Sequence, residues 1–150
     1  MIEKLFQTNT DAIWLILRLT LGLVMLPHGL QKLFGWFGGF GFAPTMQFFA
    51  AQGIPAIIAF LVIMAESLGA LFLIFGLGTR FCAASLVLVM LGAAYFQRAN
   101  GLFMNWFGNQ AGEGFEYHIL AIGIALALTI YGGGLASLDR LIQTKLFPSV

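Results

Sequence analysis

One carboxylate, Glu66, lies in the middle of a long apolar segment that runs from Ile54 to Gly78. Twelve residues separate it from each end, so on a helix it would lie about 18 Å from both ends. A charged side chain at that depth in a bilayer costs at least about 2.5–3.5 kcal/mol unless it faces other helices and is paired or protonated. We therefore expect Glu66 to face the interior of a helix bundle and to be able to carry a proton. An internal ion pair to Arg18 is the structural alternative.

A second apolar segment carries charges and glycines on one helical face. Arg18, Gly22, Met25, Gly29 and Lys32 recur at spacings of 4, 3, 4 and 3 residues. Small residues at such spacing let two helices approach closely in a membrane. The stripe predicts a packing face, with both of its charges directed inward. We expect Arg18 to be a structural intramembrane charge.

Several polar residues fall at the same end of their predicted helices and suggest a pocket with Glu66 at its floor. Two structural alternatives stay open. Glu113 and Glu116 could only interact with the positive N-terminal end of the last helix. Lys32 and Arg98 could only extend their charged ends toward the membrane surface. No metal site is expected, because the two histidines lack metal-ligand spacing. The sequence identifies no catalytic residue. The candidate pocket residues are His28, Lys32, Glu66, Glu116 and His118.

The composition requires an apolar environment for these residues. Of the 150 residues, 60% are hydrophobic and 9% are charged, whereas soluble domains carry about 25% charged residues. Such a chain cannot cover a water-exposed surface, so we expect a lipid bilayer around it. A net charge of +1 without a basic cluster excludes nucleic acid as a partner. The single cysteine, Cys82, excludes an internal disulfide and a dithiol exchange site.

The hydropathy pattern predicts an all-α membrane protein, one domain over residues 1–150, built as an antiparallel bundle of four transmembrane helices. A kink is expected at Pro27 in the first helix. The aromatic-rich connection between the first two helices is too apolar for a solvated loop, so we expect it to be interfacial or re-entrant. A short amphipathic C-terminal helix should lie along the membrane. The expected spans are about 12–34, 54–78, 80–96 and 116–134, with the interfacial segment at about 35–53.

The distribution of basic residues predicts the orientation in the membrane. Four spans place both termini on one side, and that side would carry four basic residues against two on the other. Basic residues concentrate in cytoplasmic loops, so both termini are expected in the cytoplasm. The terminal side would hold Lys4, Arg80, Arg140 and Lys145, and the outer side Lys32 and Arg98.

Three blocks of the sequence resemble the DoxX family of small bacterial inner-membrane proteins. They are RLTLGL from Arg18 with HGLQKLFG from His28, AESLG from Ala65 with GLGTR from Gly76, and GGGLASLDR from Gly132. The resemblance implies four spanning helices and a link to redox systems. One relative is the small subunit of a thiosulfate:quinone oxidoreductase, others are linked to quinone or thiol stress, and many are labelled oxidoreductases without a demonstrated reaction. The family's recurrent polar positions correspond to Arg18, His28, Lys32, Glu66 and Arg80, and to Glu116 with Tyr117.

Two classes of function follow from the residues and the resemblance. In the first, a quinone-linked redox component holds a quinone head group, with His28 on a quinone oxygen, Glu66 carrying a proton, and Trp36 and Phe40 covering the ring. The chain has no evident electron carrier or covalently bound cofactor, so a protein partner in a redox complex would supply the electrons. The second class is non-enzymatic: a membrane anchor or assembly factor, or a proton-coupled permease that uses Glu66. Whether the chain is itself an enzyme, and whether it forms a homo-oligomer, both stay open.

Overall fold

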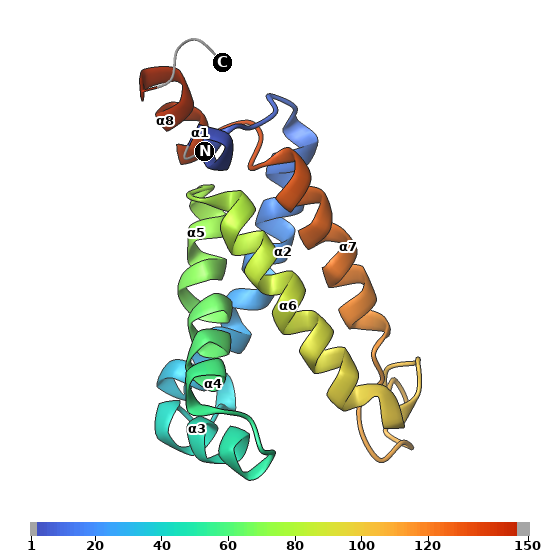
Figure 1. Cartoon of the computed structure of the whole chain (residues 1–150). Helices are drawn as coiled ribbons and strands as arrows, with labels where there is room; N and C mark the ends of the chain where they lie inside the picture. The colour runs from blue at the N-terminus through green and yellow to red at the C-terminus, as the bar shows by residue number, and fades with distance from the viewer. Residues whose placement is uncertain (1–2, 147–150) are drawn as a thin grey trace.

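Helices and their connections make up all of the chain that the structure describes, residues 3–146 of a computed structural model, and this part contains no strand (Figure 1). The all-α prediction is confirmed. The helices are α1 (Glu3–Phe6), α2 (Ala12–Phe34), α3 (Phe42–Ala51), α4 (Ala56–Met64), α5 (Ala70–Phe75), α6 (Thr79–Gln97), α7 (Glu116–Tyr131) and α8 (Leu138–Leu146). A π-helical turn, Ala65–Gly69, joins α4 to α5, and short 3-10 turns cover Trp36–Gly38 and Arg98–Asn100.

Three of the helical segments in this part of the chain are long and apolar enough to cross a membrane. They are Ala12–Phe34, Ala56–Phe75 and Thr79–Asn100. The expected fourth span begins at Glu116 as predicted, but α7 ends at Tyr131 and has only 16 residues. At about 1.5 Å per residue α7 is about 24 Å long, shorter than the hydrocarbon core of about 30 Å. The chain therefore has membrane-type helices, and α7 alone is not long enough to count as a full span.

The helices are arranged as two pairs that meet at one end and diverge toward the other (Figure 1). In the first pair α2 packs against α5 and the π-helical turn, and in the second α6 packs against α7. Contacts of α2 with α7, and of the π-helical turn with α6, join the two pairs. The buried core at this junction contains Met25, Leu73, Leu86, Ala125 and Leu128.

The connection between α2 and α4 is ordered and remains rich in exposed aromatic side chains. It contains the 3-10 turn Trp36–Gly38 and α3, and α3 packs against α4. Phe37 and Phe40 are 66% and 83% exposed, although they are large and apolar. This composition agrees with an apolar environment for the segment.

The glycine stripe of α2 is the surface on which α2 approaches the Glu66 region. Arg18, Gly22, Met25 and Gly29 are all buried, as the spacing predicts. A Cβ atom on Gly22 would lie 2.8 Å from the Ile74 side chain, and one on Gly29 would overlap the backbone of Glu66. Pro27 lies inside α2 without ending it. The absence of side chains at the two glycines therefore determines how close α2 comes to the π-helical turn.

We predict that Gly29→Ala destabilises the protein, because the new methyl group would meet the backbone of Glu66 rather than a movable side chain. Overpacking of this kind costs about 1–3 kcal/mol. The matched control is Gly123→Ala in α7, where the added Cβ meets open space. Thermal unfolding of the detergent-solubilised protein should show a lower midpoint for Gly29→Ala only. Equal midpoints for the two variants would contradict the close approach.

Candidate functional site

The Arg18 side chain is fully inside the bundle and bonds to backbone carbonyls. Its Nε donates to the carbonyl of Gly133 at 2.9 Å, and one terminal nitrogen, Nη2, donates to those of Leu135 and Ala136 at 3.3 and 2.8 Å. The other, Nη1, donates to the carbonyls of Leu73 and Ile74. The last carbonyls of a helix lack partners within the helix, so Arg18 caps α5. The alternative of an Arg18–Glu66 ion pair is therefore wrong, since each charge has other partners.

Asp139 caps the N-terminus of α6. It was not among the candidate residues of the sequence analysis. Its two carboxylate oxygens accept hydrogen bonds from the amides of Gly78 and Thr79 at 2.6 and 2.8 Å. Burial raises the pKa of the Asp139 carboxyl, while the two amides and the Arg18 charge act in the opposite direction. Asp139 belongs to the closing GGGLASLDR block, which is the signal that could have identified it. Arg18, the segment 76–79 and the closing block, one part from each of the three blocks, thus meet at this end of the bundle.

Lys32 and Glu66 form an ion pair between α2 and the π-helical turn. The Lys32 Nζ lies 2.5 Å from Glu66 Oε2, and the two side chains are 27% and 6% exposed. Lys32 follows Gly29 by one helical turn, so the close approach at Gly29 brings the two charges together. Lys32 is therefore paired, in contrast to the alternative in which it only extends toward the membrane surface. A buried ion pair is weak evidence for stability, and a π-helical turn is frequent at functional sites.

His28 and Tyr117 lie beside this pair. The His28 ring is exposed, and its centroid is 6.4 Å from that of Tyr117 on α7. The Tyr117 hydroxyl donates to the Met25 sulfur at 3.2 Å. Sequence reasoning included Tyr117 only through the DoxX resemblance. The structure thus assembles an ion pair, an imidazole and a phenol from α2, the π-helical turn and α7.

The two remaining candidate residues have different surroundings. Glu116 Oε1 accepts hydrogen bonds from the Met104 amide at 3.0 Å and from the Trp106 indole at 2.8 Å. Glu113 similarly accepts from the Asn105 amide at 2.8 Å. These bonds organise the loop 101–115 ahead of α7, which favours the interpretation of both glutamates as helix-entry residues.

His118 is half-buried, and its Nδ1 atom is buried without a hydrogen-bond partner among the described residues. Within residues 3–146, no three potential metal-ligating side chains gather as a metal site.

Replacement of Arg18 should destabilise the protein even when the positive charge is kept. Lysine has three donors on one nitrogen and cannot reproduce the planar fork that reaches five carbonyls. Each buried group left unpaired costs about 1–3 kcal/mol. We predict a much lower unfolding midpoint in detergent for Arg18→Lys, and a lower one again for Arg18→Ala. Arg98→Ala is the control, since Arg98 is exposed and bonds to the carbonyl of Tyr95 on the preceding turn. An Arg18→Lys variant as stable as this control would refute the capping role.

The Lys32–Glu66 pair predicts non-additive effects in a double-mutant cycle. Lys32→Met leaves a buried carboxylate unpaired, which costs up to about 3–5 kcal/mol and less here because Lys32 is partly exposed. Glu66→Gln removes that orphaned charge, so the double variant should recover most of the stability lost in Lys32→Met. Unfolding free energies of the four proteins measure the coupling. Additive effects in the double variant would show that the two side chains do not interact.

Comparisons with known proteins confirm the resemblance to the DoxX family. The DoxX family model matches residues 13–99, which include α2, the Lys32–Glu66 pair and α6. The chain is 33% identical over 127 residues to the Bacillus subtilis (strain 168) protein named "Putative oxidoreductase CatD". The match covers 85% of this chain and 83% of that protein. No solved structure matches. The chain belongs to the DoxX family.

Proposed function

We propose that this DoxX-family membrane protein binds a quinone, or a small hydrophobic molecule of similar chemistry, beside the Lys32–Glu66 pair and serves a quinone-linked redox system. The observation that supports the proposal is a half-buried ion pair beside an exposed histidine: Lys32 pairs with the buried Glu66 and also donates to the backbone carbonyl of His28, one helical turn earlier on α2. Charges buried among apolar helices are costly and usually mark a binding or proton-transfer site. The name of the Bacillus subtilis relative, an oxidoreductase, is consistent with this class of function.

The side chains of the cluster suit a quinone head group. His28 is exposed on the apolar exterior, so a molecule dissolved in lipid would reach its imidazole without crossing the protein. The imidazole would hydrogen-bond a quinone oxygen, and the Lys32 ammonium would stabilise negative charge on it. Glu66 would carry a proton. Trp36 and Phe40 are exposed on the adjoining connection, where they are available to cover the ring.

The electrons would come from a partner. No cofactor-binding motif was recognised in the sequence, so we infer a protein partner in a redox complex, with this chain as its membrane component. The location that fits this role is the bacterial inner membrane, where quinones are dissolved. Self-association of the chain is compatible with the same role.

We further infer four membrane crossings with both termini in the cytoplasm. The ends α1 and α8 and the start of α6 lie at one end of the bundle, and α3 and the loop 101–115 lie at the other (Figure 1). The first end carries four basic residues, which supports a cytoplasmic position. In this arrangement α7 would complete its crossing with the apolar loop that precedes it. The segment 35–53, with its exposed aromatic side chains, would lie at the outer interface.

The quinone proposal predicts that His28→Ala weakens binding of a short-chain quinone by at least about tenfold and leaves the unfolding midpoint unchanged, because the imidazole is exposed. Arg98→Ala is the control and should bind as the parent does. Quinone retained after purification is identified by mass spectrometry, and affinity is measured by titration in detergent. Parent-like binding in His28→Ala would overturn the proposal.

A membrane anchor or assembly factor is the second candidate. It is favoured by the loop 101–115, which is held by hydrogen bonds that Glu113 and Glu116 accept. This loop exposes Trp106 and Phe107, at 77% and 89%. Its rigid aromatic tips could contact a partner protein at the outer face. Purification of the native protein separates the two candidates: a stoichiometric quinone supports the first, and a protein partner without quinone supports the second.

A further inference from the structure

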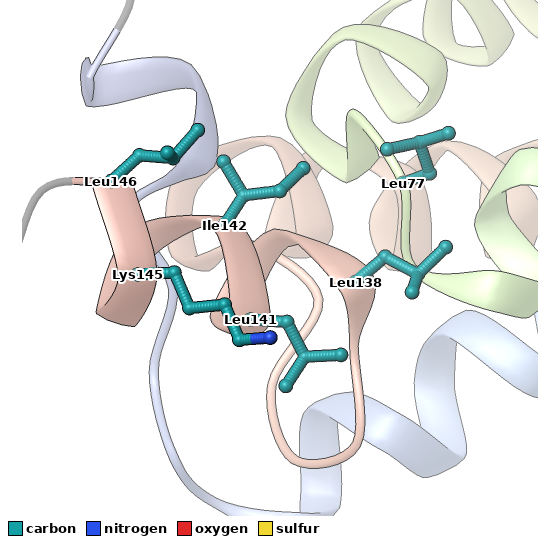
Figure 2. Close-up of a pocket in the computed structure, with 6 residues that line it drawn as sticks. All are labelled: Leu77, Leu138, Leu141, Ile142, Lys145 and Leu146. Carbon is teal, nitrogen blue, oxygen red and sulfur yellow. The ribbon is translucent and has the colours of Figure 1, made fainter.

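An apolar hollow of about 310 Å³ lies between α8 and the connection that leads from α5 to α6 (Figure 2). One wall comes from Leu77 in that connection, and the other comes from α8. The hollow is open, and Lys145 contributes the one charged group among its lining residues. These are Leu77, Leu138, Leu141, Ile142, Lys145 and Leu146.

Hydrogen bonds fix the two walls relative to each other. The Asp139 amide donates to the carbonyl of Gly76 at 2.8 Å, and the Asp139 carboxylate accepts from the amides of Gly78 and Thr79. Leu77 lies between these two anchoring points, so its position beside α8 is determined by the backbone. These bonds therefore fix the backbone on both sides of the hollow.

The surroundings of the hollow combine apolar surface with positive charge. Phe75 and Phe81, on either side of Leu77 in the sequence, are 56% and 70% exposed and continue the apolar surface of the spans. Lys4 and Lys145 are exposed on α1 and α8, which are in contact with each other. The Asp139 carboxylate is buried beneath α8, where it accepts hydrogen bonds from the amides of Gly78 and Thr79. In Figure 2 the Lys145 side chain extends along α8 toward Leu141, which also lines the hollow.

We propose that this hollow binds an acyl chain of an anionic phospholipid, whose phosphate pairs with Lys145. An amphipathic helix at a membrane surface binds through buried apolar area and through attraction of its basic residues to anionic lipids. The proposal uses the membrane position of α8 and is independent of quinone binding. The sequence alone predicts only that the C-terminal helix lies along the membrane, whereas this proposal assigns α8 a specific lipid.

The test measures lipid retained by the purified full-length protein in detergent, with phosphatidylglycerol and phosphatidylcholine as the two probes. Native mass spectrometry should show preferential retention of phosphatidylglycerol. Lys145→Glu should reduce that retention about fivefold, the effect expected for one basic residue near an anionic lipid. Arg98→Glu, a charge reversal at the opposite end of the bundle, should retain phosphatidylglycerol as the parent does. Equal retention of the two lipids, or equal loss in both variants, would overturn the proposal.

Two further measurements separate a lipid site from a simple anion site. Leu141→Asn alters the apolar wall at a half-exposed position and should reduce retention of phosphatidylglycerol although Lys145 is kept. Glycerol phosphate, the head group without acyl chains, should not displace the bound lipid. Displacement by glycerol phosphate, or parent-like retention in Leu141→Asn, would show that only an anion is bound. Lys145→Gln serves as the second charge variant if Lys145→Glu lowers the unfolding midpoint.

Discussion

The fold depends on the need to pair one buried guanidinium. Arg18 can donate five hydrogen bonds, and in an apolar environment each unpaired polar group costs several kcal/mol. Its partners are carbonyls in the last turn of α5 and in the connection between α7 and α8, where backbone carbonyls are not all bonded within a helix. The donor and the acceptors therefore satisfy each other. Through Asp139 the same region also caps α6, so α2, α5, α6 and α8 converge at one point.

The candidate site is a consequence of the same packing surface, further along α2. Gly22 and Gly29 let α2 approach α5 and the π-helical turn so closely that side chains larger than hydrogen would not fit. One turn beyond Gly29, Lys32 meets Glu66 at 2.5 Å. The widened backbone of the π-helical turn belongs to the segment that contains Glu66. The capping network and the ion pair are thus two results of one helical stripe, which joins the structural end of the bundle to the site.

Helical periodicity correctly predicted that Arg18 and Glu66 are buried, but it did not predict their partners. Arg18, Gly22 and Gly29 lie on one face of a single helix because of their spacing, and this was enough to predict that they face inward. The pairing of Glu66 with Lys32 depends on where two helices cross, which no single-helix pattern contains. Likewise Glu116 is directed by the conformation of the loop 101–115, where its oxygen accepts the Trp106 indole. The fourth helix is shorter than expected because positive φ angles at Gly132 and Gly134 end its helical geometry.

The position of the single cysteine limits the redox chemistry that the chain itself can perform. Cys82 lies on α6 and is buried in the core, and the sequence has no second cysteine to resolve a mixed disulfide. A link to thiol stress, which the family suggests, therefore cannot operate through disulfide exchange within this chain. His28, by contrast, is exposed and Lys32 is partly exposed, and both side chains can donate a hydrogen bond to an oxygen of a lipid-soluble molecule. The redox role proposed above therefore does not use Cys82 but a lipid-soluble ligand and a partner that supplies the electrons.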